Sequence, residues 1–237
     1  MTRPRIAFLG VGWIGRHRMN AILETGLAEA CGICEPDATL AAEAKGLAPE
    51  ATVVATYEEL LALEPDGVVI ATPSALHAEQ SIRALETGAA VFCQKPLGRN
   101  AAEAAAVVEA ARNADRLLGV DLSYRFTDGM KQVVSIVRGG GLGEVFAVDL
   151  VFHNAYGPGK PWFFDAALSG GGCVMDLGVH LVDLALWALD FPAVVKAESH
   201  LFAGGRPFVA GQPGVEDFCF ATLTLATGCV VRLTCSW

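Results

Sequence analysis

The sequence has little positive charge. It holds 17 lysine and arginine residues against 26 aspartate and glutamate residues, which gives a net charge of -9 at pH 7 and a pI near 5.0. No basic stripe is therefore available to neutralise the phosphates of a nucleic acid. We expect no nucleic-acid partner.

Long apolar runs are also lacking, although the mean hydropathy of +0.42 is high. The apolar residues come in short runs broken by Gly, Pro or charge, and none approaches the roughly 20 residues of a membrane span. Arg3 and Arg5 followed by the apolar stretch 6–14 resemble the start of a signal peptide. A glycine motif in the same stretch explains these residues better, so we predict neither export nor membrane insertion.

Disulfide, metal and hydrolase signatures are missing as well. The seven cysteines are scattered and odd in number, so they form no obvious disulfide framework, and a reducing cytoplasm suits them best. His17, His77, His153 and His200 show no ligand spacing with Cys or Asp, so we expect no metal site. The sequence has no G-x-S-x-G elbow and no P-loop.

What the sequence does have is a glycine motif close to its start. Residues 6–9 form an apolar run typical of a strand buried on both faces of a parallel sheet. Glycines in G-x-G-x-x-G spacing follow, and the next residues recur with helical periodicity. Such a turn lets the N-terminus of the helix approach a pyrophosphate. The residues expected to contact a cofactor here are Gly10, Gly12, Trp13, Ile14 and Gly15.

An acidic residue downstream supports this interpretation. Alone, the glycine motif is equally consistent with an ordinary turn between a strand and a helix. A second apolar segment, residues 28–34, ends in Glu35, twenty residues after Gly15, where a dinucleotide fold carries the acid that binds the adenosine ribose. A carboxylate there repels a 2'-phosphate, and no arginine follows closely. We therefore predict dinucleotide binding, with NAD favoured over NADP.

Strands and helices alternate through the first half of the chain. This rhythm predicts an α/β fold, a Rossmann-type doubly wound parallel sheet covered by helices on both faces. The expected strands are 6–9, 28–34, 52–55, 67–72, 89–94 and 117–122, and the expected helices after the glycine turn are 38–45, 57–63, 74–87 and 101–113.

The rhythm changes near residue 143. The segments 144–153, 218–225 and 229–237 alternate between apolar and polar residues, and 226–228 is typical of a hairpin loop. One strong helix, 174–189, interrupts them. We predict an α+β second domain with a mainly antiparallel open sheet, and place the domains at 1–122 and 123–237. Because the last expected strand ends at Trp237 with nothing to cover the sheet edge, the sequence is expected to be incomplete.

A lysine follows one of the central strands. Lys95, in the sequence Cys93-Gln94-Lys95-Pro96, stands at the carboxyl end of an expected strand, where ligands bind in open α/β sheets. It could stabilise a charged oxygen. An exposed lysine at the start of a loop fits its position equally well.

A histidine lies between two carboxylates in the second domain. Asp176, His180 and Asp183 are spaced i, i+4 and i+7, so they share one face of the expected helix. A histidine in such a setting is fixed in one tautomer and suits a general acid or base. The alternative is a capped, charge-paired helix face.

These pieces together resemble the Gfo/Idh/MocA family, named after glucose-fructose oxidoreductase, inositol dehydrogenase and rhizopine catabolism. Besides the glycine motif, the resemblance rests on 71–77, the triplet 94–96, 123–126, 141–145 and 170–183, which follow in the family's order. It implies an N-terminal Rossmann domain and a C-terminal open sheet whose face often forms a homodimer or homotetramer interface. It also implies an NAD(P)-dependent dehydrogenase acting on CH-OH groups.

The resemblance implies roles for particular residues. Lys95 resembles the family's catalytic lysine, and Asp176 and His180 resemble its substrate-binding and proton-transfer pair. The side chains expected to line the nicotinamide are Thr72, Pro73, His77, Gln94 and Lys95. Glu is usual where this sequence has Gln94, which removes a negative charge beside Lys95.

The expected reaction is oxidation of a secondary alcohol of a sugar, cyclitol or related polyol. Two alternatives stay open, a non-catalytic dinucleotide-binding regulator and a glycosidase-like member that uses NAD transiently. The side chains expected to shape the substrate pocket are Tyr124, Arg125, His153, Tyr156, Trp162, Asp176 and His180.

Overall fold

The computed structural model describes residues 2–209 and 211–237, which divide into two compact units, Met1–Asp121 and Leu122–Trp237. The first unit contains a six-stranded parallel sheet with strand order β3-β2-β1-β4-β5-β6, the order of a dinucleotide-binding Rossmann fold. Its strands are β1 (Arg5–Leu9), β2 (Glu29–Cys34), β3 (Thr52–Val54), β4 (Gly67–Ile70), β5 (Ala90–Cys93) and β6 (Leu118–Val120).

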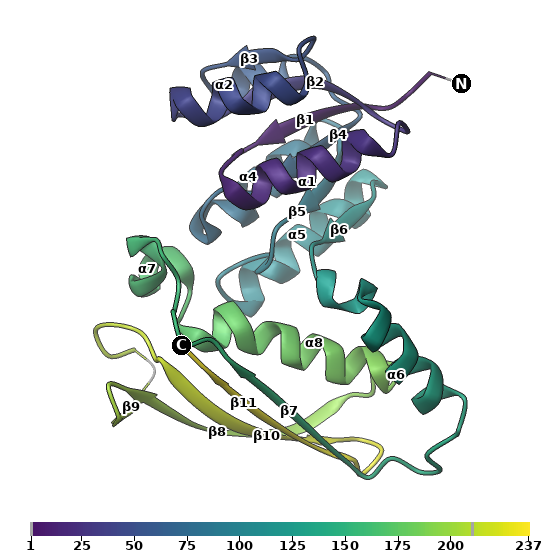
Figure 1. Cartoon of the computed structure of the whole chain (residues 1–237), viewed down its shortest axis with the longest axis vertical. Coiled ribbons are helices and arrows are strands. Elements are labelled where there is room, and N and C mark those ends of the chain that lie inside the picture. Colours follow the sequence, from purple (N-terminus) through teal and green to yellow (C-terminus); the bar gives the residue numbers. More distant parts are fainter. Residues whose placement is uncertain (1, 210) are drawn as a thin grey trace. The chain divides into compact units, whose positions relative to one another are not determined.

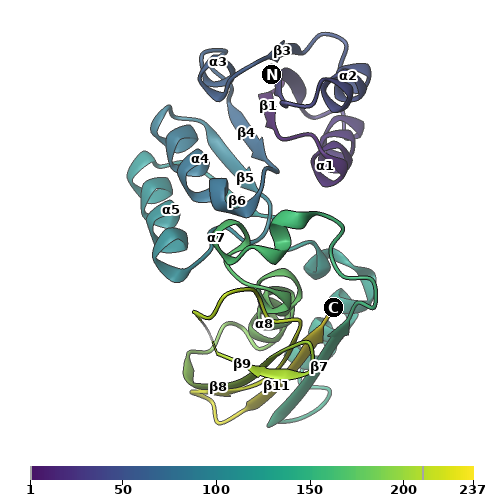
Figure 2. The same cartoon turned by 90° about the vertical axis from the view of Figure 1, so that its left-hand side faces the viewer.

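Helices cover both faces of this sheet. They are α1 (Trp13–Glu24), α2 (Ala38–Leu47), α3 (Tyr57–Leu61), α4 (Ser74–Glu86) and α5 (Ala101–Ala114). Figure 2 shows α4 and α5 on one side and α1 and α2 on the other. Alternate residues of the strands point to opposite faces of the sheet and pack in two separate cores. Leu9 and Ile70 pack with α3, α4 and α5, whereas Phe8 and Val69 pack with α1 and α2.

The predicted elements of the first unit are confirmed within a few residues of each end. The capping residues explain this accuracy. Asp37 accepts from two backbone N–H groups at the start of α2, Thr56 and Glu59 form a capping box on α3, and Asn100 caps α5.

The second unit is a five-stranded sheet with one long helix across it (Figure 1). Its strand order is β7-β11-β10-β8-β9, and its pairings are antiparallel except for the parallel pair β7 and β11. Its elements are β7 (Ala147–His153), β8 (Val194–Ala203), β9 (Arg206–Phe208), β10 (Phe218–Leu225), β11 (Val230–Ser236), α6 (Asp128–Arg138), α7 (Ala166–Ser169) and α8 (Val179–Ala188), with 3-10 turns η1 (Ser123–Phe126) and η2 (Pro161–Phe164) and a π turn η3 (Val174–Gly178).

Several expectations for this unit differ from the structure. The predicted hairpin of β10 and β11 is confirmed, but β8, β9 and α6 were not predicted. Most of β8 is exposed, so its sequence lacks the alternation that marks a half-buried strand. The expectation that the last strand leaves an open edge is wrong, because β11 lies between β7 and β10.

The core of the second unit lies between the long helix and the sheet. Leu177, Leu181 and Ala185 pack against Leu223 and Val231. The stretch Ala166–Ala188 is long and apolar enough to cross a membrane by length and composition alone. It is broken at Gly170, which has a φ of 87°, and its inner face belongs to this core. These features are typical of a core helix in a globular domain.

Candidate functional site

The carboxyl ends of five parallel strands form one row across the first unit. Strand register aligns their last residues, and four of the residues that follow them, Gly10, Ala71, Gln94 and Asp121, donate their backbone N–H to a neighbouring strand at 2.8–2.9 Å. Ligands of open α/β sheets bind at this edge. The residues that follow the strands there are Gly10, Glu35, Ala71, Gln94 and Asp121.

The glycine turn follows β1, and the surrounding backbone leaves no space for a side chain at Gly10 or Gly15. Gly10 has a φ of 79°, and a Cβ on it would lie 2.8 Å from the backbone of Ala71. A Cβ on Gly15 would lie 2.1 Å from the carbonyl oxygen of Gly10. Because Gly12 caps α1 without a side-chain hydrogen bond, the first N–H groups of the helix are left to an anion. Trp13 is exposed and Ile14 is half-buried beside this turn.

Glu35 is fixed against the same turn. Its Oε2 accepts from the N–H of Val11 at 2.8 Å, and its Oε1 accepts from the N–H of Asp37 at 3.2 Å. A carboxylate has further lone pairs on both oxygens, so it can also accept from ribose hydroxyls. The glycine turn, the uncapped helix and this acid therefore fit the pyrophosphate and adenosine ribose of a dinucleotide.

His77 lies behind the loops that follow β4 and β5. It is 1% exposed, and its Nδ1 and Nε2 lie 2.7 Å from Pro96 O and 2.8 Å from Thr72 O. Burial lowers the pKa of the imidazole, although the two carbonyl oxygens oppose this shift. His77 was expected to line the nicotinamide, but its ring nitrogens contact the protein's own backbone. It holds the loops of Thr72 and Pro96 together.

The other predicted residues of these loops lie nearer the surface. The hydroxyl of Thr72 donates to Gln80 Oε1 at 2.6 Å, and Pro73 is exposed at the start of α4. Lys95 is half-buried directly after β5. Gln94 is buried, and its amide donates to Asp121, a residue that sequence reasoning missed.

In the second unit, Asp176 lies within the π turn η3 and His180 in the first turn of α8. Asp176 Oδ2 accepts from the indole N–H of Trp237 at 3.0 Å. His180 is buried, and the ring of Tyr124 meets it edge to face with centroids 4.6 Å apart. A π turn is a local widening of a helix that often occurs at functional sites. Asp176 and His180 are thus both held by aromatic side chains.

Asp183 does not complete the expected arrangement of a histidine between two carboxylates. Its carboxylate binds Arg125, with Nε to Oδ2 at 2.8 Å and a second hydrogen bond from Nη2. This pair raises the pKa of Arg125. The expectation that Asp183 serves His180 is therefore replaced by an ion pair that fixes η1 to α8. The same pair occupies Nε and Nη2 of Arg125, a residue that was expected to shape the substrate pocket.

Glu216 is a buried carboxylate that the sequence analysis missed. Its Oε1 accepts from the N–H groups of Gly172 and Val174 at 2.9 and 3.0 Å. A Cβ on Gly172 would lie 1.8 Å from the backbone oxygen of Glu216. The glycine run before η3 therefore lets the chain approach Glu216 and fixes the turn that carries Asp176.

The remaining predicted substrate residues are scattered within this unit. Trp162 stacks on Phe163 with centroids 3.8 Å apart, and Tyr156 is 97% exposed. His153 was wrongly expected in the pocket. Since neighbouring strand residues point to opposite faces, Phe152 packs in the core and meets Tyr124, whereas His153 lies on the outer face.

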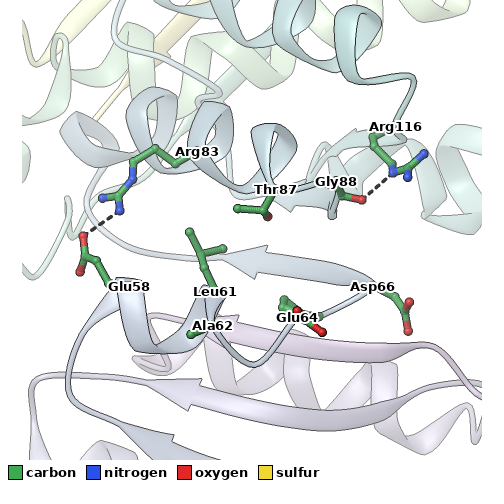
Figure 3. Close-up of a pocket in the computed structure, with 10 residues that line it drawn as sticks. Glu58, Leu61, Ala62, Glu64, Asp66, Arg83, Thr87, Gly88 and Arg116 are labelled. Carbon is green, nitrogen blue, oxygen red and sulfur yellow. Dashed lines mark hydrogen bonds and ion pairs between the residues drawn. The ribbon is translucent and has the colours of Figure 1, made fainter.

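A groove in the first unit lies at the opposite edge of its sheet. Figure 3 shows it between α3, α4 and the chain before β6, with an ion pair of Arg83 and Glu58 at 2.7 Å. Glu64, Asp66 and Arg116 also line it, and they precede their strands. The groove is therefore at the amino ends of the strands, where open α/β sheets do not place their ligands. Among residues 2–209 and 211–237, no group of three or more His, Cys, Asp or Glu side chains is arranged to hold a metal ion.

The chain matches known families over most of its length. Residues 4–122 match the oxidoreductase family with an NAD-binding Rossmann fold, GFO_IDH_MocA, and residues 130–237 match the GFO/IDH/MocA C-terminal domain. The first half of the chain is thus an NAD-binding Rossmann domain.

Several curated relatives are dehydrogenases by name. The chain is 29% identical to a D-glucoside 3-dehydrogenase of Escherichia coli, over 98% of this chain and 70% of that protein. It is 33% identical to an inositol 2-dehydrogenase of Rhodococcus erythropolis, over 78% of this chain and 53% of that protein. The chain thus spans between about half and 70% of the length of these relatives.

The fold also matches solved structures. GenD2 from gentamicin A biosynthesis, solved in complex with NAD, superposes with a TM-score of 0.89 at 24% identity, over 100% of this chain and 66% of that one. This likeness confirms the predicted fold class, a Rossmann unit followed by a unit with a mixed sheet.

Proposed function

The chain belongs to the Gfo/Idh/MocA family of oxidoreductases, and on that premise we propose that it is an NAD-dependent dehydrogenase. We propose that it oxidises a secondary alcohol of a sugar, cyclitol or related polyol. The observation that supports this most is the row at the carboxyl edge of the first sheet, where the glycine turn, Glu35 and Lys95 follow aligned strands.

NAD rather than NADP suits the first unit. The N–H groups at the start of α1 would hold the pyrophosphate, and Glu35 would accept from both ribose hydroxyls. The negative charge of Glu35 would repel a 2'-phosphate. When bound, NAD supplies the acceptor for the hydrogen that leaves the alcohol carbon with its electron pair.

We assign the proton chemistry to three side chains. Oxidation of an alcohol to a carbonyl requires that the hydroxyl lose its proton, and His180 would take it at a ring nitrogen. The ammonium group of Lys95 would stabilise the negative charge that develops on the oxygen. Asp176, held by Trp237, would orient His180 or a neighbouring hydroxyl of the substrate.

Recognition of the substrate would fall to the aromatic side chains of the second unit. Tyr124 contacts His180 directly and is the best placed of them. Trp162 would offer an apolar ring face to a sugar or cyclitol, and Tyr156 a hydroxyl. Arg125 would act through Asp183, because that pair fixes η1 to α8.

We further propose that the chain forms a homodimer or homotetramer through the outer face of the second sheet. This face carries a row of stacked rings: His200 lies on Phe220 with centroids 4.6 Å apart, and Phe218 meets Phe202 and His153. Phe220 is 43% exposed. An apolar aromatic patch of this kind is typical of a protein interface.

A cytoplasmic location fits the cysteines of the chain. All seven are free thiols, and six of them are buried. Thiols that stay reduced are typical of the cytoplasm.

The test is a screen of sugars, inositols and sugar acids with NAD and with NADP. The absorbance of the reduced cofactor measures turnover. We expect turnover with NAD and at least one polyol. NAD binding without turnover across the panel would favour the non-catalytic regulator instead. Conversion of a glycoside without net accumulation of reduced cofactor would favour the glycosidase-like alternative.

A further inference from the structure

A buried carboxylate lies next to the residue that precedes Lys95. Gln94 and Asp121 follow β5 and β6, and they are 8% and 6% exposed. The N–H of Asp121 donates to Cys93 O at 2.9 Å, which brings the ends of the two strands together. The side-chain amide of Gln94 donates to Asp121 Oδ2.

A third element reaches the same oxygen. Arg18, on the helix α1 that follows the glycine turn, donates from Nε to Asp121 Oδ2 at 2.5 Å. The positive charge of the guanidinium compensates the buried carboxylate, which would otherwise be costly. One oxygen of Asp121 therefore ties α1 to the ends of β5 and β6.

The chemistry of this contact fixes the orientation of the Gln94 amide. An ionised carboxylate only accepts hydrogen bonds, so the nitrogen of the amide must face Asp121 and its oxygen must point away. A glutamate at position 94 would instead place two carboxylates in contact in a buried site. Gln94 and Asp121 thus form a matched pair in which Asp121, the residue after β6, carries the negative charge.

The two neighbours of Lys95 along the chain, Gln94 and Pro96, are both fixed by contacts to other residues. On one side the amide of Gln94 is bound by Asp121, and on the other the carbonyl of Pro96 contacts His77. The position of Lys95 therefore depends on contacts made by its neighbours along the chain. His77 contacts the backbone carbonyl of Pro96, whereas Asp121 contacts the side chain of Gln94. The contact between these two side chains can be removed by substitution.

We propose that Asp121, compensated by Arg18, is a positioning residue for Lys95: it fixes the Gln94 amide and so sets where the peptide after β5 lies. Its importance for catalysis rests on the proposed function, in which Lys95 acts on the substrate oxygen. The position of Lys95 is set within the first unit, so the effect of Asp121 on it can be measured without any substrate.

The first experiment is a double-mutant cycle in the full chain, read by thermal unfolding. Gln94→Glu should lower the midpoint at pH 8 by at least about 4 °C, and by less near pH 4, where one carboxylate takes a proton. Asp121→Asn in the Gln94→Glu background should recover most of this loss. Gln132→Glu adds the same charge to an exposed glutamine of α6 and should leave the midpoint unchanged. Additive losses in the double variant would overturn the matched pair.

The second experiment measures Lys95 directly. A soluble amine-reactive reagent acetylates lysine side chains, and mass spectrometry measures the rate of acetylation at Lys95. Exposed Lys131 serves as the internal control. Asp121→Ala, which leaves the Gln94 amide without this acceptor, should raise the rate at Lys95 several-fold and leave Lys131 unchanged. Arg18→Gln, which removes the compensating charge from a partly exposed side chain, should raise this rate less and serves if Asp121→Ala does not fold.

The outcomes separate positioning from function. A stability loss in Asp121→Ala with an unchanged rate at Lys95 would make Asp121 merely structural and overturn the proposal. A raised rate at Lys95 in a protein that binds NAD but turns over no polyol would support the positioning and count against the proposed dehydrogenase. Where turnover is found, Asp121→Ala should lower kcat and leave the Kd for NAD nearly unchanged.

Discussion

Glu35 Oε2 accepts a hydrogen bond from the backbone N–H of Val11 at 2.8 Å. The acid at the end of β2 is therefore fixed against the glycine turn that follows β1. Since the carboxylate is held before any ligand arrives, little side-chain entropy remains to be lost when a ribose binds.

This contact predicts the effect of removing the charge at position 35. Glu35→Gln keeps an oxygen that can accept from Val11 but no longer repels a 2'-phosphate. The ratio of the NADP and NAD dissociation constants should fall by on the order of tenfold, the size expected for a charge-assisted hydrogen bond. Titration calorimetry with both cofactors measures it. Glu29→Gln, at the exposed start of the same strand, should keep the wild-type ratio. An unchanged ratio in Glu35→Gln would show that the acid does not select the cofactor.

Gly15 should not tolerate a side chain. Because a Cβ there would lie 2.1 Å from Gly10 O, Gly15→Ala must push α1 away from the turn. We expect loss of NAD binding and a destabilisation of about 1–3 kcal/mol in chemical unfolding. The matched control is Gly46→Ala in α2, where nothing lies within 4 Å of the added carbon. It should stabilise the chain by about 0.5 kcal/mol, and NAD affinity retained in Gly15→Ala would contradict the close packing.

Lys95 should matter for turnover and not for affinity. Lys95→Ala removes the proposed charge stabilisation, so kcat should fall by a factor on the order of 10² to 10³. The Kd for NAD should stay within about twofold, since the proposed contacts to the pyrophosphate and ribose are made by the glycine turn and Glu35. Steady-state kinetics and cofactor titration separate the two effects. Turnover at the wild-type rate would remove the proposed role.

The buried imidazole of His77 should make the stability of the fold depend on pH. Burial lowers its pKa below the usual 6.5, so the unfolded chain binds a proton more readily than the folded one. The contribution of His77 to stability is therefore complete above about pH 6.5 and is lost as the pH falls through that value toward the folded pKa.

His77→Gln should flatten this dependence. Between pH 7 and pH 5 the wild-type free energy of unfolding should fall more steeply than that of the variant, by up to about 1.4 kcal/mol per pH unit. Urea titrations at several pH values measure the slopes. Ser81→Ala, on the same buried side of α4, should keep the wild-type slope. Parallel pH profiles for wild type and His77→Gln would count against a buried neutral ring.

The sequence could predict the strands and helices of the first unit because their signals are local. The glycine spacing, the acid after β2 and the capping residues all act within a few positions, and they set the elements that the register then aligns. Asp121 could not be found in this way. Its partner Arg18 is 103 positions away in the chain, and an aspartate at the end of a short strand has no pattern of its own.

The second unit was harder for a similar reason. Whether Asp183 serves His180 or Arg125 depends on where η1 lies, which helical spacing does not encode. The outward direction of His153 follows from the strand register, once the strand is placed. Glu216 precedes β10 without any local signal and acts on a glycine run more than 40 positions earlier.

The aromatic outer face of the second sheet predicts the behaviour of a charged variant. Phe220→Glu places a carboxylate among stacked rings, where burial in an interface would cost several kcal/mol. The variant should run as a smaller species than wild type in size-exclusion chromatography with light scattering. Leu117→Glu, at an exposed leucine of the first unit, should run as wild type. Identical masses for wild type and Phe220→Glu would exclude this face as the interface.

The aligned strand ends have a consequence for how the protein could change over evolutionary time. The cores of the first unit are built from residues within the strands and helices, whereas the groups with chemical roles sit on short segments just beyond them. Selection could therefore exchange these segments, and with them the preference between NAD and NADP, while the scaffold beneath keeps its stability.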